Sequence, residues 1–249
     1  MLIKTNQDIK LIKEASRIWK LARAAILDKV CEGMKLIDLD EIAREVIESN
    51  GASCAFYNYL GFPKHICISV NETLIHGVPD DYCLKKGDLV TFDIGIKFEN
   101  HFCDAAFTVI VGKGSIEAQT INDVCYQSLM TAIASIKPNQ TTNLDLAAII
   151  EDYVTSNGYE VIRNFTGHGC GNEIHEDPII PNYRSFLFSK VMLVPNMVIC
   201  IEPMIMTKSN KYIISKKDNW AVIAKNKKLT CHWEHMILIT ENGCEILTE

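Results

Sequence analysis

Hydrophobic residues recur every three or four positions over residues 7–28, with lysine and arginine side chains between them. This spacing places the apolar side chains on one face of a helix, so we predict a helix over 7–28. A second helix is predicted over 38–50, with Asp38 as its N-cap and Gly51 directly after its end. Extended segments are expected to dominate from about residue 55 to residue 112.

The same order of elements returns in the second half of the chain. Helices are predicted over 115–135, after Ser115, and over 143–157, between Thr142 and Gly158. Most of the remaining chain has the pattern of strands, and the segment NETLIHGVP resembles the later segment NEIHEDP. A weak repeat of about 110 residues predicts two α+β halves related by a pseudo-twofold axis, with a pocket where the halves meet.

Composition and charge limit the classes of protein to which the chain can belong. The 249 residues contain no low-complexity linker, so we predict one domain over 1–249. The net charge of −6 argues against a strong basic field that would recruit DNA or acidic membranes. The N-terminal residues are charged throughout, without the apolar core of a signal peptide, and no apolar run is long enough to span a membrane. We expect a cytoplasmic location, and ten scattered cysteines without a C-x-x-C pair are typical of reduced, buried thiols.

Four carboxylates lie inside apolar runs that contain almost no lysine or arginine: Asp93, Asp104, Glu202 and Glu234. A buried carboxylate is costly unless a positive charge neutralises it. His168 lies in the segment FTGHGCGNEIH, where glycines let the backbone approach a ligand closely. Oxygen and imidazole ligands suit Mn, Fe, Co or Zn, so the sequence predicts a site for divalent metal ions.

The spacing of Asp93 and Asp104 indicates that both belong to one hairpin. A turn signal near Glu99 and Asn100 would place Asp93 roughly opposite Asp104, on the same face of the sheet. Two carboxylates at that distance repel each other unless a cation lies between them.

Alternation in the segment CHWEHM places His232 and Glu234 on one face of a strand and His235 on the other. We therefore expect His235 to be structural rather than a metal ligand. His76 in NETLIHGVPDD and His175 in NEIHEDP are candidate hydrogen-bond donors to a ligand.

Taken together, these segments resemble the signature blocks of methionine aminopeptidase type I. The blocks are NETLIHGVPDD, DLVTFDIGI, HFCDAAFTVIVG, FTGHGCGNEIHEDP, VICIEPMI and WEHMILIT, and the resemblance extends from about residue 5 to residue 247. It implies the short bacterial-type form of this family. It also implies the α+β pita-bread fold, in which two pseudo-twofold-related halves form a curved antiparallel sheet that helices cover.

Carried over position by position, the resemblance implies that two divalent ions (Co, Mn, Fe, Zn or Ni) bind to each chain. Asp93 would bind one ion, and His168 and Glu202 would bind the other. Asp104 and Glu234 would bridge both. A hydroxide that bridges the two ions would attack the scissile carbonyl.

The resemblance also implies the groups that act on the substrate. His76 and His175 would donate hydrogen bonds to it, and Glu202 would shuttle a proton. Leu60 lies where relatives commonly have histidine, which can change the rate or the preference of the enzyme. Phe165 likewise lies where tyrosine is frequent. Besides the two histidines, the implied methionine pocket is lined by Tyr59, Phe62, Cys67, Phe165, Ile174 and Trp220.

The implied activity is removal of the N-terminal methionine from nascent proteins and peptides, with a preference for small second residues. Binding of the substrate's free amine to one ion would restrict the enzyme to the chain terminus. From the family we further expect a monomer that acts at the ribosome, without a DNA or membrane partner.

Three other functions stay open at this point. A proline-specific peptidase of the same fold would share the five ligand positions, but such enzymes usually have an additional N-terminal domain. A non-enzymatic relative that binds RNA or protein would lack metal ligands and have a basic surface. A cysteine hydrolase would use Cys170 or Cys231, which lie near histidines in the sequence.

Overall fold

The computed structural model describes residues 3–249, and its α-helices begin and end within two residues of the predicted positions. Each helix has a buried stripe at helical spacing, as the hydrophobic pattern requires. The helices are α1 (Asn6–Lys29), α2 (Leu36–Ser49), α3 (Ile116–Ala134) and α4 (Asn143–Ser156).

Side-chain capping fixes the start of α1. The hydroxyl of Thr5 accepts a hydrogen bond from the backbone N–H of Asp8, and the Asp8 carboxylate accepts one from the backbone N–H of Thr5. The prediction of Asp38 as the N-cap of α2 is wrong. The N-cap is Lys35, whose side chain makes no capping bond, and Asp38 lies in the first turn. Leu36 is buried, so packing extends the helix two residues upstream, and Asp38 still complements the positive end of the helix.

The strands pair antiparallel throughout the described residues. One sheet has the order β1-β4-β2, with β5 paired to β4, and a second has the order β15-β14-β9-β7-β8. Two smaller sheets have the orders β13-β10-β6 and β11-β12-β3. The strands are β1 (Ser53–Cys54), β2 (Cys67–Val70), β3 (Thr73–Ile75), β4 (Leu89–Phe98), β5 (His101–Ile110), β6 (Tyr159–Val161), β7 (Gly167–Gly169), β8 (Glu176–Ile180), β9 (Val198–Ile201), β10 (Met204–Thr207), β11 (Tyr212–Ile214), β12 (Val222–Ala224), β13 (Thr230–His232), β14 (His235–Ile239) and β15 (Cys244–Ile246).

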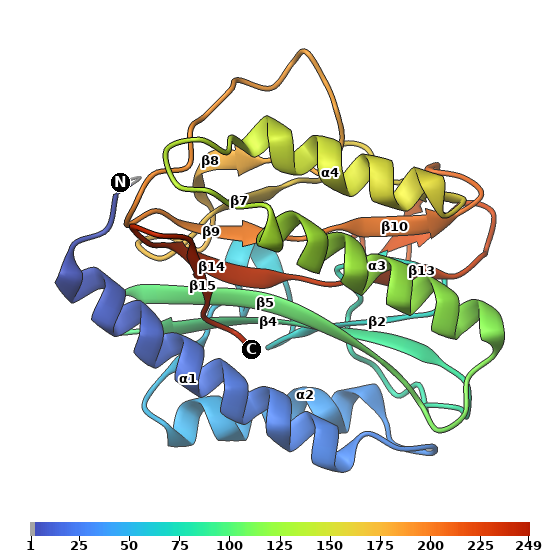
Figure 1. The fold of residues 1–249 in the computed structure, drawn as a ribbon. Helices are drawn as coiled ribbons and strands as arrows, with labels where there is room; N and C mark the ends of the chain where they lie inside the picture. Colours follow the sequence, from blue (N-terminus) through green and yellow to red (C-terminus); the bar gives the residue numbers. More distant parts are fainter. Residues whose placement is uncertain (1–2) are drawn as a thin grey trace.

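Two hydrophobic cores lie on opposite sides of the central strands. Helices α1 and α2 pack with β4 and β5 in one core, and α3 and α4 close the other (Figure 1). Strand β9 contributes to both: Val198 and Cys200 face the first core, whereas Ile199 and Ile201 face the second. Burial on both faces explains why this strand is a continuous apolar run rather than an alternating one.

The two halves predicted from the repeat meet along β5 and the segment that joins β13 to β14. The backbone N–H of Glu234 donates to the carbonyl of Ala106 at 2.9 Å. The hydroxyl of Thr108 donates to the carbonyl of His232 at 2.5 Å. The carboxylate-bearing strands of the two halves are therefore adjacent.

Two further features agree with the composition. Among residues 3–249, no helix combines the length and the apolar character that a membrane crossing requires. All ten cysteines are free thiols, and most are buried, as small hydrophobic residues would be.

Candidate metal centre

The β4–β5 hairpin carries the first two carboxylates. Its turn lies at Glu99 and Asn100, both with positive φ, as the turn signal predicted. The predicted facing of Asp93 and Asp104 is wrong by two positions, because Asp93 pairs with Ala106 and Asp104 pairs with Gly95. Since side chains alternate with a period of two, the two carboxylates still share one face of the sheet as diagonal neighbours.

The second half supplies His168, Glu202 and Glu234. His168 lies at the centre of β7, Glu202 directly follows β9, and Glu234 lies between β13 and β14. A Cβ atom at Gly167 would lie 2.3 Å from a carbonyl oxygen of β9, and one at Gly169 would lie 2.2 Å from the carbonyl oxygen of Asp177. The glycines on either side of His168 therefore let β7 approach its neighbours closely enough to place the imidazole among the carboxylates.

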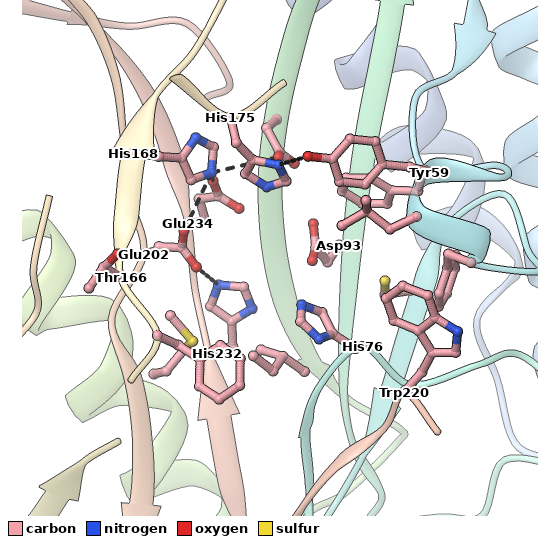
Figure 2. A pocket seen from close by; sticks show the side chains of 18 residues that line it. Tyr59, His76, Asp93, Thr166, His168, His175, Glu202, Trp220, His232 and Glu234 are labelled. Carbon is pink, nitrogen blue, oxygen red and sulfur yellow. Dashed lines mark hydrogen bonds and ion pairs between the residues drawn. The ribbon is translucent and has the colours of Figure 1, made fainter. Parts of the chain in front are cut away.

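The five side chains predicted as metal ligands line the same cavity (Figure 2). Nε2 of His168 lies 3.5 Å from Oε1 of Glu202. The same nitrogen lies 3.9 Å from Oδ2 of Asp104 and 4.0 Å from Oε1 of Glu234. Oxygens of Asp93, Asp104 and Glu234 lie within 4.8 Å of one another.

Three of these oxygens are buried and unpaired. Within residues 3–249, Oδ1 of Asp93, Oδ1 of Asp104 and Oε1 of Glu234 have no hydrogen-bond partner. No lysine or arginine of the described chain lines the cavity. Buried anionic oxygens without donors are rare in folded proteins, and this oxygen-rich set with one imidazole fits first-row divalent ions.

Burial makes the negative charge of this cluster costly. It raises the pKa of Asp93 from 3.8 to about 7. Burial also raises the pKa values of Asp104 and Glu234 well above the usual range, and repulsion by neighbouring carboxylates raises both further. Burial raises the pKa of Glu202 as well, and it lowers that of His168 to about 3. A bound cation would offset these penalties, because it stabilises the carboxylates as anions and the imidazole as a neutral base.

Comparison with known proteins agrees with a metal centre. The model of metallopeptidase family M24 matches residues 10–241. The chain belongs to this family. It is 40% identical over 247 residues to a methionine aminopeptidase of Mycoplasmoides gallisepticum, covering 99% of this chain and 98% of that one. It is 36% identical over 248 residues to methionine aminopeptidase 1 of Bacillus subtilis, covering 100% and 99%.

Solved structures of M24 relatives share the architecture. A methionine aminopeptidase from Thermotoga maritima superposes with a TM-score of 0.95 at 34% identity, and each chain is covered completely. A prolidase from Pyrococcus furiosus superposes with a TM-score of 0.80 at 27% identity, but only 65% of that chain is covered. The prediction of the α+β pita-bread fold is therefore confirmed.

All the predicted substrate-binding residues of the M24 chain except Ile174 line one cavity of about 320 Å³. The rings of Phe62 and Trp220 meet edge to face, with centroids 5.3 Å apart. Ile174 does not line the cavity itself and instead packs behind it, in a small core cluster with Phe56, Phe62 and Cys67. Among the predicted residues, those that line the cavity are Tyr59, Phe62, Cys67, His76, Phe165, His175 and Trp220.

Two of the predicted histidines reach this cavity from different loops. His76, with φ at 56°, lies edge-on to Phe165 and Trp220, and burial lowers its pKa to about 4. Nδ1 of His175 lies 3.0 Å from the Tyr59 hydroxyl, and burial lowers the pKa of His175. Both rings are therefore neutral at pH 7, with one N–H each.

His235 lies away from the cavity, as predicted. Its Nδ1 pairs with the Thr248 hydroxyl at 2.9 Å, and it lines a separate hollow on the reverse side of its strand. The cysteine-hydrolase alternative has no support here, because Cys170 and Cys231 are fully buried and outside the cavity.

Several cavity residues were not predicted to be functional. His232 lines the cavity beside Glu202. The sequence contained one sign of this, because strand alternation places His232 on the same face as Glu234. Phe56, Ile75, Thr166 and Met204 also line the cavity, but their positions depend on contacts that no local pattern reveals.

Proposed function

We propose that residues 1–249 form one catalytic domain that removes N-terminal methionine from peptides and nascent proteins with the help of divalent ions. The observation that carries this proposal is the set of three buried, unpaired carboxylate oxygens beside His168, in a cavity that no lysine or arginine of the described chain lines. Full-length similarity to methionine aminopeptidases supports the substrate.

The carboxylates and His168 would hold the ions. We propose that Asp93 would hold one ion, that His168 and Glu202 would hold the other, and that Asp104 and Glu234 would contribute to both. Divalent ions held there supply Lewis-acid polarisation of a carbonyl and lower the pKa of water. A mixed oxygen and nitrogen ligand set of this kind accepts Co, Mn, Fe, Zn or Ni.

His175 and His76 would act on the substrate as neutral hydrogen-bond donors. When the Tyr59 hydroxyl donates to Nδ1 of His175, the proton of that imidazole resides on Nε2 and can be donated to substrate oxygen. His76 would stabilise charge that develops on the scissile group in the same way. Glu202 would accept a proton and pass it to the leaving amine, the shuttle role that the resemblance to methionine aminopeptidases implies.

The apolar wall would select the methionine side chain. Thioether sulfur makes favourable contacts with aromatic rings, of about 0.3–1.5 kcal/mol each. Phe62, Phe165 and Trp220 supply such rings, and Cys67 lies in the same apolar cluster as Phe62 and Trp220. Leu60 lines the outer part of the cavity and is 81% exposed. It is therefore placed to contact the second residue of a peptide, where we propose that small side chains are preferred.

A local basic surface supports the proposed contact with ribosomes. Residues 208–228 contain seven lysines and one aspartate, although the net charge of the chain is −6. All seven lysines are exposed, and Trp220 in the same segment lines the cavity. Lysines clustered on one segment attract the phosphates of RNA through counterion release.

The peptidase proposal is tested by hydrolysis of Met-Ala-Ser by chelator-treated protein with each divalent ion restored in turn. We expect activity to return with at least one ion. Hydrolysis of Xaa-Pro peptides in preference to Met-Ala-Ser would contradict the proposal in favour of a proline-specific peptidase.

The ribosome proposal is tested by cosedimentation at two salt concentrations. Replacing Lys211, Lys216 and Lys228 by glutamate should abolish salt-sensitive cosedimentation, with peptide hydrolysis unchanged because none of these residues lines the cavity. Failure of the wild-type chain to cosediment at low salt would contradict this contact.

A further inference from the structure

His232 is a buried histidine whose hydrogen-bonding capacity is unused. The residue is 1% exposed, and within residues 3–249 neither ring nitrogen has a hydrogen-bond partner. In contrast, the buried His235 pairs with Thr248, and Nδ1 of His168 pairs with a backbone carbonyl at 2.9 Å. A buried polar group without a partner is destabilising, which favours a partner that His232 meets once the site is filled.

The carboxylate of Glu202 lies between two imidazoles. Its Oε1 is 3.5 Å from Nε2 of His168, and its Oε2 is 3.5 Å from Nε2 of His232 (Figure 2). Nε2 of His168 is also the atom that approaches Asp104 and Glu234, so Oε1 faces the carboxylate cluster. Oε2 is turned to the opposite side, where His232 is the neighbouring imidazole.

The backbone of His232 is held firmly in place. His232 in β13 pairs with Met204 in β10. Its backbone carbonyl accepts a hydrogen bond from the hydroxyl of Thr108 on β5. Nε2 of His232 and Oε2 of Glu202 are 3.5 Å apart. A movement of roughly 0.6 Å would bring these two atoms to hydrogen-bond distance. Rotation of the Glu202 side chain can supply that movement without a shift of the His232 backbone.

We propose that His232 is a positioning residue of the metal centre, whose Nε2–H donates to Oε2 of Glu202 and keeps Oε1 turned toward His168. This inference rests on the proposed function, because it assigns Oε1 to a bound ion. Groups that hydrogen-bond to a metal-ligating side chain fix its orientation, and their loss typically weakens metal affinity about 10–100-fold.

Two substitutions of similar polarity separate this role from simple packing. The amide nitrogen of glutamine can occupy the place of Nε2, whereas that of asparagine is too short to reach it. We therefore expect His232→Asn to weaken Mn²⁺ binding about 10–100-fold, and His232→Gln to restore most of the affinity. His101→Asn is the matched control, because His101 pairs with Asp8 outside the cavity and should leave affinity unchanged.

The measurement is calorimetric titration of chelator-treated protein with Mn²⁺, accompanied by visible absorption of the Co²⁺-loaded form. Unchanged Co²⁺ bands in His232→Gln support positioning. Shifted bands together with lost affinity in His232→Gln would show that His232 binds the ion directly and would overturn the proposal. Wild-type affinity in His232→Asn would overturn it as well. A folded wild-type chain that binds no divalent ion would instead refute the proposed function, and this inference with it.

Discussion

Asp93→Asn should stabilise the metal-free protein at pH 8. Burial raises the pKa of Asp93 from 3.8 to about 7 when no cation is present. An acid whose pKa is higher in the folded state binds more protons there than in the unfolded chain. It therefore lowers the free energy of unfolding progressively as the pH rises from about 4 to about 7. Asparagine has the same shape without the charge, so it removes this penalty.

The magnitude follows from the same pKa values. A rise from 3.8 to about 7 corresponds to about 4 kcal/mol at pH 8 and to little at pH 4. Asp93→Asn should therefore raise the free energy of unfolding by about 2–4 kcal/mol. The lower end of this range applies because neighbouring carboxylates already share protons in the wild-type chain. With Mn²⁺ at about a hundred times its dissociation constant, the wild-type chain should gain about 2.7 kcal/mol. The variant lacks one ligand and should gain less.

Urea unfolding of chelator-treated protein, followed by tryptophan fluorescence, measures both effects. The assay compares wild type and Asp93→Asn at pH 5 and pH 8, with and without Mn²⁺. Asp123→Asn serves as the control, because this exposed carboxylate on α3 should change stability by no more than about 0.5 kcal/mol. The reasoning is refuted if Asp93→Asn is less stable than wild type at pH 8 in chelator, or if Mn²⁺ stabilises both proteins equally.

Three further predictions concern catalysis, packing and capping. His76→Ala should lower the turnover of Met-Ala-Ser about 10²–10³-fold, because it removes a donor to the developing charge; unchanged turnover would exclude His76 from the mechanism. Gly95→Ala should destabilise the protein by about 1–3 kcal/mol in thermal denaturation, because its Cβ would lie 2.7 Å from the ring of Phe56; an unaltered Tm would show that the ring yields freely. Thr142→Ala should lower the free energy of unfolding in urea by about 1 kcal/mol, because it removes the capping box of α4. The exposed Thr120→Ala should lower it by less, and equal effects of the two substitutions would contradict the capping argument.

The helices and the carboxylate positions could be predicted because their signals are local. Burial has a period of about 3.6 residues in helices and two in strands, and a carboxylate inside an apolar run is visible without knowledge of the fold. The register of Asp93 and Asp104 shows how robust the second signal is. An error of two positions in the hairpin left both side chains on the same face, so the metal site survived it.

Other features depend on contacts between distant segments and could not be predicted. Leu36 extends α2 beyond the expected cap because it packs into the first core, which propensity alone does not reveal. Only the structure shows that the ring nitrogens of His232 lack hydrogen-bond partners and that Glu202 lies beside them. The basic segment 208–228 is a different case, because its lysines can be counted in the sequence and only the negative net charge of the whole chain hides it.

Anomalous diffraction from crystals grown with Mn²⁺ tests the central claim most directly. The account predicts two anomalous peaks per chain among Asp93, Asp104, His168, Glu202 and Glu234, with the unpaired oxygens directed at them. Strong Mn²⁺ peaks elsewhere, with none among these five side chains, would contradict it.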